Sequence, residues 1–240
     1  MSTQAPDISV VILCYRSEHA LRPFAARMKE VLERRGLDYE LVLVANFDAA
    51  GPTDRTPEIA KEIAREDDRI AVLARPKEGM MGWDMRSGLA AARGNTIAVI
   101  DGDGQMPPED ALAVYDLLMA EGHDMVKTYR KERRDGLVRI VVSTVYNVVL
   151  KLLFPEVKVR DANSKPKIFT RQALSRLALT SDDWFIDAEI VIQASRLGLS
   201  IGETPTVFLA SRNRPSFITA TAILNFMRDL VAYRRRHPWG

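Results

Sequence analysis

Two carboxylates that flank a glycine are the most distinctive chemical feature of the chain. Asp101-Gly-Asp103 follows directly on the apolar run Thr96–Ile100, and Gln105-Met-Pro-Pro108 comes next. Carboxylate oxygens suit Mg²⁺ or Mn²⁺, and such sites leave positions open for substrate phosphates. Asp and Gly are also common in turns, so the pair by itself would indicate only a turn. Its place after an apolar strand and before Gln-x-Pro-Pro favours a divalent cation site.

Charge is distributed unevenly along the 240 residues. Residues 1–124 carry 14 Lys and Arg against 22 Asp and Glu, whereas residues 125–240 carry 20 against 10. A scatter of solvated charges would explain this, and so would one site with an anionic half for a cation and a basic half for an anion. The composition, 47% hydrophobic and 28% charged, excludes a disordered or collagen-like chain. One cysteine and three histidines argue against a disulfide framework and against Cys- or His-based metal sites.

Apolar runs alternate with helical patterns in the first half, which indicates βαβ units and a mostly parallel sheet. Ligands of such sheets bind beyond the carboxyl ends of the strands, where Asp101 and Asp103 stand. The expected strands are Ile8–Cys14, Tyr39–Ala45, Ile70–Ala74 and Thr96–Ile100. The expected helices are Ala20–Arg35, one that starts at Thr56, Gly82–Arg93, and one that ends near Glu121.

The second half is less regular. A polar residue recurs every fourth position within the apolar stretch Leu137–Phe154, which would form one polar stripe on a helix, although the valines leave a strand open. We expect strands at Met125–Arg130 and Ile201–Leu209, a charged loop at Lys131–Gly136, a helix at Phe185–Leu197 and an amphipathic helix at Phe217–Arg236.

Several segments together resemble family 2 glycosyltransferases with the GT-A fold, in particular the dolichyl-phosphate mannosyltransferase and polyprenyl-phosphate glycosyltransferase group. The resemblance covers roughly residues 10–236. It is carried by Asp101–Pro108 (D-x-D-x-Q-x-P-P), Arg75–Gly94, Asp161-Ala-Asn-Ser-Lys-Pro-Lys167, Trp184–Glu189 and Arg212-Asn-Arg-Pro-Ser216. It implies an α/β fold of GT-A type, a single Rossmann-like domain with a mostly parallel central sheet flanked by helices and a C-terminal amphipathic helix.

The resemblance also implies roles for individual residues. It assigns the metal, Mg²⁺ or Mn²⁺, to Asp101, Asp103 and Gln105, and the donor nucleotide-sugar to Tyr15, Asn46, Asp48, Lys77, Asp101 and Gln105. It assigns the acceptor phosphate to Arg130, Arg139, Ser143 and Arg212, and catalysis to Asp103, Asp187, Arg139 and Arg212. Arginine offers a planar fork that suits phosphate oxygens. For Asp187, stabilisation of a helix N-terminus is the competing interpretation, and for Arg130 it is a solvated loop.

The chain departs from the family pattern at three places. Val44-Ala-Asn-Phe-Asp48 stands where the family has two Asp followed by Gly-Ser, which leaves the base of the donor undetermined. Lys165-Pro166 replaces Gly-Phe, and Pro215 replaces a glycine. These departures indicate an altered donor or acceptor pocket.

We therefore expect a metal-dependent, inverting transferase that moves a hexose from a GDP- or UDP-sugar to a polyprenyl phosphate or similar lipid phosphate. A transferase with a non-polyprenyl acceptor and a non-catalytic nucleotide-binding or scaffold protein are the alternatives. One domain is expected over residues 1–240, with a nucleotide-sugar and metal half (1–124), an acceptor half (125–215) and a C-terminal helix with a basic tail (216–240).

The location of the protein is the last expectation. The longest stretch without charge, Pro215–Met227, has 13 residues, whereas a membrane span takes about 20. The N-terminus lacks the layout of a signal peptide. We expect a cytoplasmic protein that meets a lipid phosphate by peripheral contact with the membrane or through a membrane-protein partner, and no nucleic acid as partner.

Overall fold

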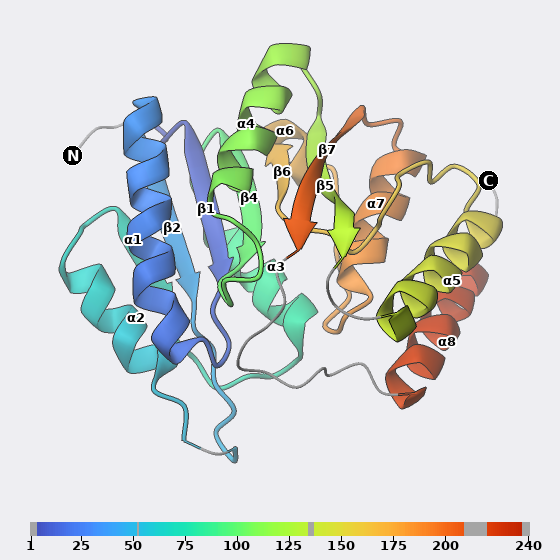
Figure 1. The fold of residues 1–240 in the computed structure, drawn as a ribbon, viewed down its shortest axis with the longest axis horizontal. Helices are drawn as coiled ribbons and strands as arrows, with labels where there is room; N and C mark the ends of the chain where they lie inside the picture. The colour runs from blue at the N-terminus through green and yellow to red at the C-terminus, as the bar shows by residue number, and fades with distance from the viewer. Residues whose placement is uncertain (1–3, 52, 134–136, 209–219, 237–240) are drawn as a thin grey trace.

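A seven-stranded sheet forms the centre of the computed structural model, which describes residues 4–51, 53–133, 137–208 and 220–236 (Figure 1). The strands are β1 (Ile8–Leu13), β2 (Tyr39–Val44), β3 (Ile70–Leu73), β4 (Thr96–Asp101), β5 (Met125–Arg133), β6 (Lys167–Thr170) and β7 (Ile201–Phe208). The helices are α1 (Glu18–Arg35), α2 (Thr56–Arg65), α3 (Met81–Ala91), α4 (Glu109–Glu121), α5 (Leu137–Leu153), α6 (Arg171–Ser175), α7 (Ile186–Arg196) and α8 (Ala220–Arg236).

Strand order and direction bring most carboxyl ends to one edge of the sheet. The order is β3-β2-β1-β4-β6-β5-β7. β1 pairs in parallel with β2 and β4, and β5 pairs in parallel with β7, whereas β6 is antiparallel to both β4 and β5. The six strands other than β6 therefore share one direction, and the predicted mostly parallel sheet is confirmed.

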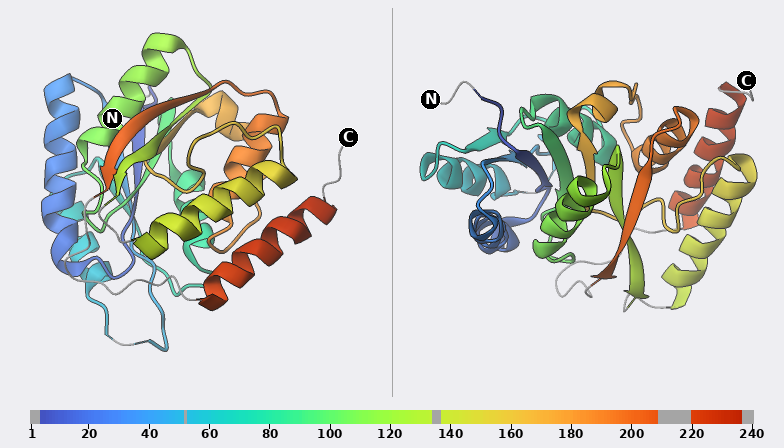
Figure 2. Two further views of the ribbon diagram at one scale, coloured as in Figure 1. Left: turned by 45° about the vertical axis from the view of Figure 1, so that its right-hand side comes forward. Right: turned by 90° about the horizontal axis from the view of Figure 1, so that it is seen from above.

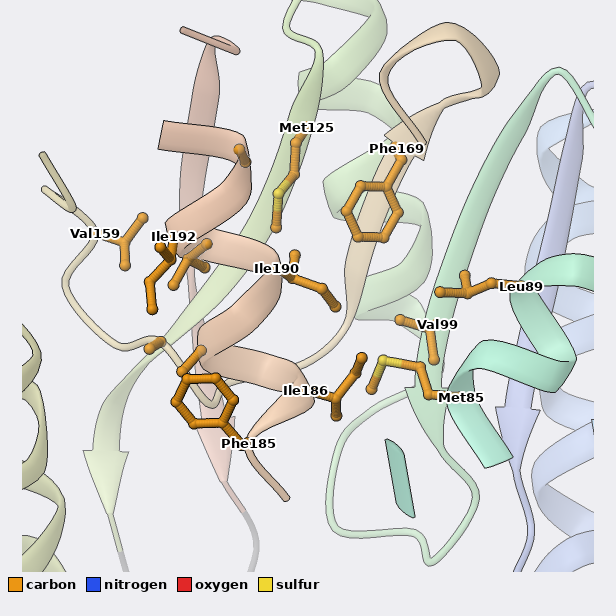
Figure 3. Packing of buried hydrophobic residues seen from close by; sticks show 14 of the residues in the cluster. Met85, Leu89, Val99, Met125, Val159, Phe169, Phe185, Ile186, Ile190 and Ile192 are labelled. Carbon is orange, nitrogen blue, oxygen red and sulfur yellow. The ribbon is translucent and has the colours of Figure 1, made fainter. Parts of the chain in front are cut away.

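Helices cover both faces of the sheet because alternate residues of each central strand point to opposite sides. Val10 and Ile12 of β1 pack with α1, α2 and α4, while Val11 and Leu13 pack with α3 and α7. Figure 3 shows the second cluster, in which Ile186 and Ile190 of α7 lie near residues of α3, β4 and β6. Both clusters are large enough to fix the strand ends firmly.

A close approach of α3 to the sheet depends on Gly88. A Cβ atom at this position would lie 2.4 Å from Val11 Cγ1 and 2.7 Å from Val44 Cγ2. Glycine therefore lets α3 lie directly on β1 and β2, next to the strand ends.

The predicted elements agree with the structure apart from a few boundaries. Leu137–Leu153 forms a helix, so the strand alternative is wrong there. The expected charged loop is also wrong for residues 131–133, because β5 continues and Glu132 and Arg133 pair with β7. The short helix α6 was not expected; it begins at the cap Thr170, whose Oγ1 accepts a hydrogen bond from the Ala173 amide at 3.1 Å. Residues 217–219 of the expected last helix lie outside the described residues.

Helices α5 and α8 lie side by side beyond the β7 end of the sheet (Figures 1 and 2). The Tyr233 ring of α8 lies 6.2 Å from the Phe154 ring and 5.2 Å from the Phe185 ring, measured between centroids. The buried residues Leu230 and Tyr233 thus pack α8 against the core. None of the described helices has both the length and the apolarity that a membrane crossing requires.

Candidate active site

Three adjacent strands end next to one another at the edge where the predicted donor residues lie. In the sheet register Leu13 pairs with both Val44 and Asp101, so β1, β2 and β4 end at the same level. Tyr15 and Asn46 follow the ends of β1 and β2, and Asp101 is the last residue of β4. The last residues of each strand before this edge are apolar and buried, and the polar side chains follow directly after them.

The Asp101–Asp103 turn is held against β1 by its backbone. The Gly102 amide donates to the Leu13 carbonyl at 2.9 Å, and a Cβ at Gly102 would lie 2.8 Å from Ile12 Cγ2. Asp103 Oδ1 accepts from the Gln105 amide at 3.0 Å. Glycine is thus required by the close approach, and the two carboxylates stand on either side of it.

The oxygen donors at this turn suit a hard divalent cation in part. The Asp101 side chain is 28% exposed, so solvent reaches it. Within the described part of the chain, no three His, Cys, Asp or Glu side chains converge on one point. Carboxylate oxygens of this kind are ligands that Mg²⁺ and Mn²⁺ accept, and Mg²⁺ usually takes one or two of them together with waters and substrate phosphates.

Two lysines and two aspartates connect the Asp101 turn to helix α7. The Lys165 ammonium lies 3.3 Å from Asp101 Oδ2 and 3.2 Å from Asp187 Oδ2. The Lys167 ammonium lies 2.5 Å from Asp187 Oδ1. Asp187, Lys165 and Lys167 are all buried. Lys165, just before β6, and Lys167, the first residue of β6, therefore place two positive charges between the end of β4 and the first turn of α7.

The charges of this cluster favour ionised groups at Asp187 and Lys165. Burial opposes ionisation of Asp187, but the two ammonium groups outweigh it and hold its pKa below the ordinary value. Burial likewise opposes the charge on Lys165, but Asp101 and Asp187 outweigh it and raise the pKa of Lys165. For Lys167 burial prevails and lowers the pKa, although Asp187 opposes this.

A second network of charged side chains, centred on Arg130 of β5, lies next to the cluster of Lys165, Lys167, Asp101 and Asp187. Arg130 donates to both Asp161 oxygens, with Nε 2.6 Å from Oδ2 and Nη2 3.0 Å from Oδ1. Burial opposes ionisation of Asp161, but the Arg130 guanidinium outweighs it and holds the pKa of Asp161 well below its usual range. Thr128 Oγ1 donates to the Lys165 carbonyl at 2.6 Å and also contacts Ser164 Oγ at 2.7 Å. The segment 161–165 thereby links the predicted acceptor residue Arg130 to the donor edge.

The predicted donor residues at the other strand ends form a buried hydrogen-bonded group. Asn46 Nδ2 donates to Asp84 Oδ1 at 2.9 Å, and Asn46 Oδ1 accepts from the Arg75 amide at 3.1 Å. The Lys77 ammonium pairs with Asp84 and lies 4.3 Å from the centre of the Tyr15 ring. Burial raises the pKa of Asp84, although Lys77 and Asn46 oppose this. Tyr15, Asn46 and Lys77 therefore lie together, as a donor site requires.

Other predicted residues stand apart or are not described. Asp48 Oδ1 accepts from the Ala50 amide at 3.1 Å and so closes its own turn. Ser143 lies on α5 one turn after Arg139, and its carbonyl accepts from Asn147 Nδ2 at 2.8 Å. Arg212 lies outside the described residues, as does the Arg139 side chain.

Sequence reasoning missed two residues of the site, Asp84 and Lys127. Asp84 lies in the first turn of α3 inside a segment that resembles the family, but its partner Asn46 is 38 residues away. Lys127 follows the buried residues Met125 and Val126 in β5 and is itself fully buried, with its ammonium donating to the Thr128 and Asp161 carbonyls. A lysine within a buried strand was the signal that could have revealed it.

A cavity of about 490 Å³ lies away from these residues. The outer face of α3 and the segment after α6 line it, including Trp83, Arg86 and Leu177. None of the predicted site residues lines it, so the site follows from the strand ends and the charge network.

Several curated relatives of the chain carry names that contain a polyprenyl or dolichyl phosphate. It is 31% identical over 147 residues to an undecaprenyl-phosphate 4-deoxy-4-formamido-L-arabinose transferase of Pectobacterium carotovorum, which covers 60% of this chain and 43% of that protein. It is 27% identical over 200 residues to a dodecaprenyl-phosphate galacturonate synthase of Rhizobium johnstonii, which covers 81% of this chain and 58% of that protein. The chain thus spans about half the length of these relatives.

Solved structures of glucosyl-3-phosphoglycerate synthase from Mycobacterium tuberculosis share the fold. The complex with UDP superposes with a TM-score of 0.73 at 23% identity, over 98% of this chain and 82% of that one. The complex with Mn²⁺, UDP and glucosyl-3-phosphoglycerate gives 0.71 at 22%, over 96% and 80%. The model of the family described as "Glycosyl transferase family 2" matches residues 9–180. With this match the chain belongs to glycosyltransferase family 2, and its sheet has the arrangement of the solved GT-A structures.

Proposed function

We propose that the protein transfers a hexose from a UDP- or GDP-sugar to a polyprenyl phosphate or similar lipid phosphate, with inversion at the anomeric carbon. This proposal rests on one observation: the segment 161–167 connects two networks of charged side chains, one around a carboxylate and one around a guanidinium group. One network contains Asp101, at the strand ends typical of nucleotide sites, and the other contains Arg130. The lipid phosphates named for the curated relatives support the acceptor class.

The donor side is assigned to the ends of β1, β2 and β4. Asp101, Asp103 and Gln105 would hold Mg²⁺ or Mn²⁺, which neutralises the charge of a diphosphate leaving group. Tyr15, Asn46 and Lys77 would bind the nucleotide beside it. Support comes from their hydrogen-bonded grouping through Asp84 and from the UDP and Mn²⁺ in structures of the same fold.

The acceptor side is assigned to Arg130, Arg139, Ser143 and Arg212. A phosphate monoester already carries its nucleophilic oxygen in the ionised form near neutral pH, so strong base catalysis is not needed. The basic residues have to bind this anion and align it with the anomeric carbon. Asp161 holds the Arg130 fork in one orientation, and such preorganisation lowers the cost of alignment.

A labelled-donor assay tests this function. Purified protein is incubated with Mn²⁺, undecaprenyl phosphate and radiolabelled UDP- or GDP-hexoses, and lipid-linked sugar is measured after extraction. We expect one donor to give labelled lipid, and Asp103→Ala to lower the rate roughly a hundredfold or more because the leaving-group charge is no longer compensated. The anomeric configuration of the product, read by NMR, tests inversion.

The solved structures of the same fold favour a second acceptor class, a small soluble phosphate ester, since glucosyl-3-phosphoglycerate is bound in one of them. The same assay with 3-phosphoglycerate in place of the lipid separates the two classes. Labelled soluble product with no labelled lipid overturns the lipid acceptor. Absence of either product with every common donor overturns the transferase function and favours a non-catalytic nucleotide-binding protein.

A further inference from the structure

Lys165 occupies a fixed position between the donor edge and helix α7. Its ammonium contacts Asp101 Oδ2 at 3.3 Å and Asp187 Oδ2 at 3.2 Å, and the residue is only 4% exposed. Its carbonyl accepts from Thr128 Oγ1 at 2.6 Å, so its main chain is tied to β5 as well. A buried lysine held from both ends has little freedom to leave Asp101.

Asp101 therefore faces two different environments. Lys165 lies against Oδ2, while 28% of the Asp101 side chain remains exposed to solvent. A divalent ion at Asp101 would share this carboxylate with a positive charge a few ångströms away. Repulsion between like charges is strong where water is scarce.

The neighbouring groups do not cancel this effect. Asp187 is engaged on its other oxygen by Lys167 at 2.5 Å. Lys165 is thus one of two ammonium groups that share a single carboxylate, and Asp101 supplies the second negative charge. Lys165 and Asp101 together form a pair without net charge. An approaching diphosphate is therefore repelled less by the Asp101 carboxylate, even without a metal ion.

We propose that Lys165 is a permanent positive charge of the donor site and shares the Asp101 carboxylate with the divalent ion. Its charge weakens the binding of a divalent ion to the free protein. The same charge makes the binding of the donor diphosphate less dependent on metal. This inference rests on the proposed function in taking Asp101 and Asp103 as the cation site for the donor diphosphate.

The first experiment measures Mn²⁺ binding to the free protein by electron paramagnetic resonance, without donor or acceptor. Lys165→Met removes the charge and keeps a side chain of similar length, and we expect it to tighten Mn²⁺ binding roughly tenfold. Lys158→Met, at an exposed lysine in the same connection between α5 and β6, is the matched control and should leave the affinity unchanged. Adding Asp103→Ala to Lys165→Met should abolish the gain. Equal affinity in wild type and Lys165→Met overturns the proposal, and so does a gain that survives Asp103→Ala.

A second experiment needs no variant and so holds even if Lys165→Met fails to fold. Calorimetry compares UDP and GDP binding to the wild-type protein in EDTA and in saturating Mn²⁺. We expect the better nucleotide to bind in EDTA and to gain less than tenfold with Mn²⁺. A gain of tenfold or more, or no binding in EDTA, overturns the proposal. Because neither experiment requires turnover, absence of glycosyl transfer would count against the proposed function and leave these outcomes readable.

Discussion

Two lysines face each other across the ladder between β5 and β6. Lys127 pairs with Lys167 in the register, and both side chains are fully buried. Adjacent buried charges of one sign are costly, and the cost appears as altered protonation. Asp187 compensates Lys167 directly, whereas Lys127 has backbone carbonyls and, at 3.9 Å, Glu203. Lys127 is therefore the member of the pair that lacks a close carboxylate to hold its proton.

We predict that stability depends on pH through Lys127. Burial, with Lys167 adding to it, lowers the Lys127 pKa to about 7 in the folded protein, against about 10.4 in an unfolded chain. Between these values the unfolded chain holds a proton that the folded protein lacks, so folding becomes more favourable as pH rises. Below pH 7 Lys127 is protonated in both the folded and the unfolded state, and the free-energy cost of burying its charge then lowers the stability in full.

Urea unfolding of wild type and Lys127→Met at several pH values checks this. The unfolding free energy of wild type relative to the variant should rise by about 2 kcal/mol between pH 7 and pH 9. Lys158→Met, at an exposed site, should show no such pH-dependent difference. A difference between wild type and Lys127→Met that stays constant with pH would contradict the assignment.

At the scale of elements, the strands near the donor edge were predictable and the reversed strand was not. β1, β2 and β4 are apolar runs long enough to be predicted as strands. The start of the Asp101 turn is predicted by the end of β4. β6 has four residues and reverses direction, and neither fact follows from hydrophobic periodicity. The contact of Lys165 with Asp101 and Asp187 depends on that reversal, because it brings the segment before β6 to the carboxyl edge. The sequence showed Lys165 only as a departure from a pattern.

The start of α3 is docked on the segment that leads into α7, and we predict that Gly82 makes this docking possible. A Cβ at Gly82 would lie 2.5 Å from the Ser181 carbonyl oxygen and 2.6 Å from that of Asp183. The Met80 and Trp83 amides donate to the Asp182 carbonyl at 2.8 and 3.1 Å. Gly82→Ala should therefore force backbone apart and lower stability by roughly 1–3 kcal/mol.

Chemical denaturation measures that loss of stability. The transfer assay shows whether a displacement of α7, which carries Asp187, changes the rate of transfer. Ala90→Ser adds one heavy atom to an exposed position of the same helix and should change stability by less than about 0.5 kcal/mol. If Gly82→Ala behaves like Ala90→Ser, the close approach of the two segments is not what stabilises this part of the fold.

Over the whole molecule, the near-zero net charge of +2 is a cancellation between two unlike halves. The acidic first half supplies Asp101 and Asp84, and the basic second half supplies Lys127, Lys165 and Arg130. The charge pattern alone predicted one site built from both halves, and in the structure a residue of each half, Asp101 and Lys165, forms an ion pair at 3.3 Å. The rest of the basic excess lies elsewhere, including the last turn of α8.

We predict that this excess binds the protein to anionic membranes. Arg235 and Arg236 are exposed at the end of α8, and the neighbouring α5 exposes the apolar residues Val145, Val148 and Leu152. Basic residues near an anionic surface contribute about 1 kcal/mol each. Arg235→Gln with Arg236→Gln should therefore weaken sedimentation with phosphatidylglycerol vesicles about tenfold or more, whereas Lys61→Gln with Arg65→Gln on α2 should not. Raising salt should weaken wild-type binding because exposed charges are screened.

Equal binding to neutral vesicles, or equal loss in both double variants, would show that the basic end of α8 does not direct the protein to a lipid surface. The lipid acceptor would then have to be presented by another protein.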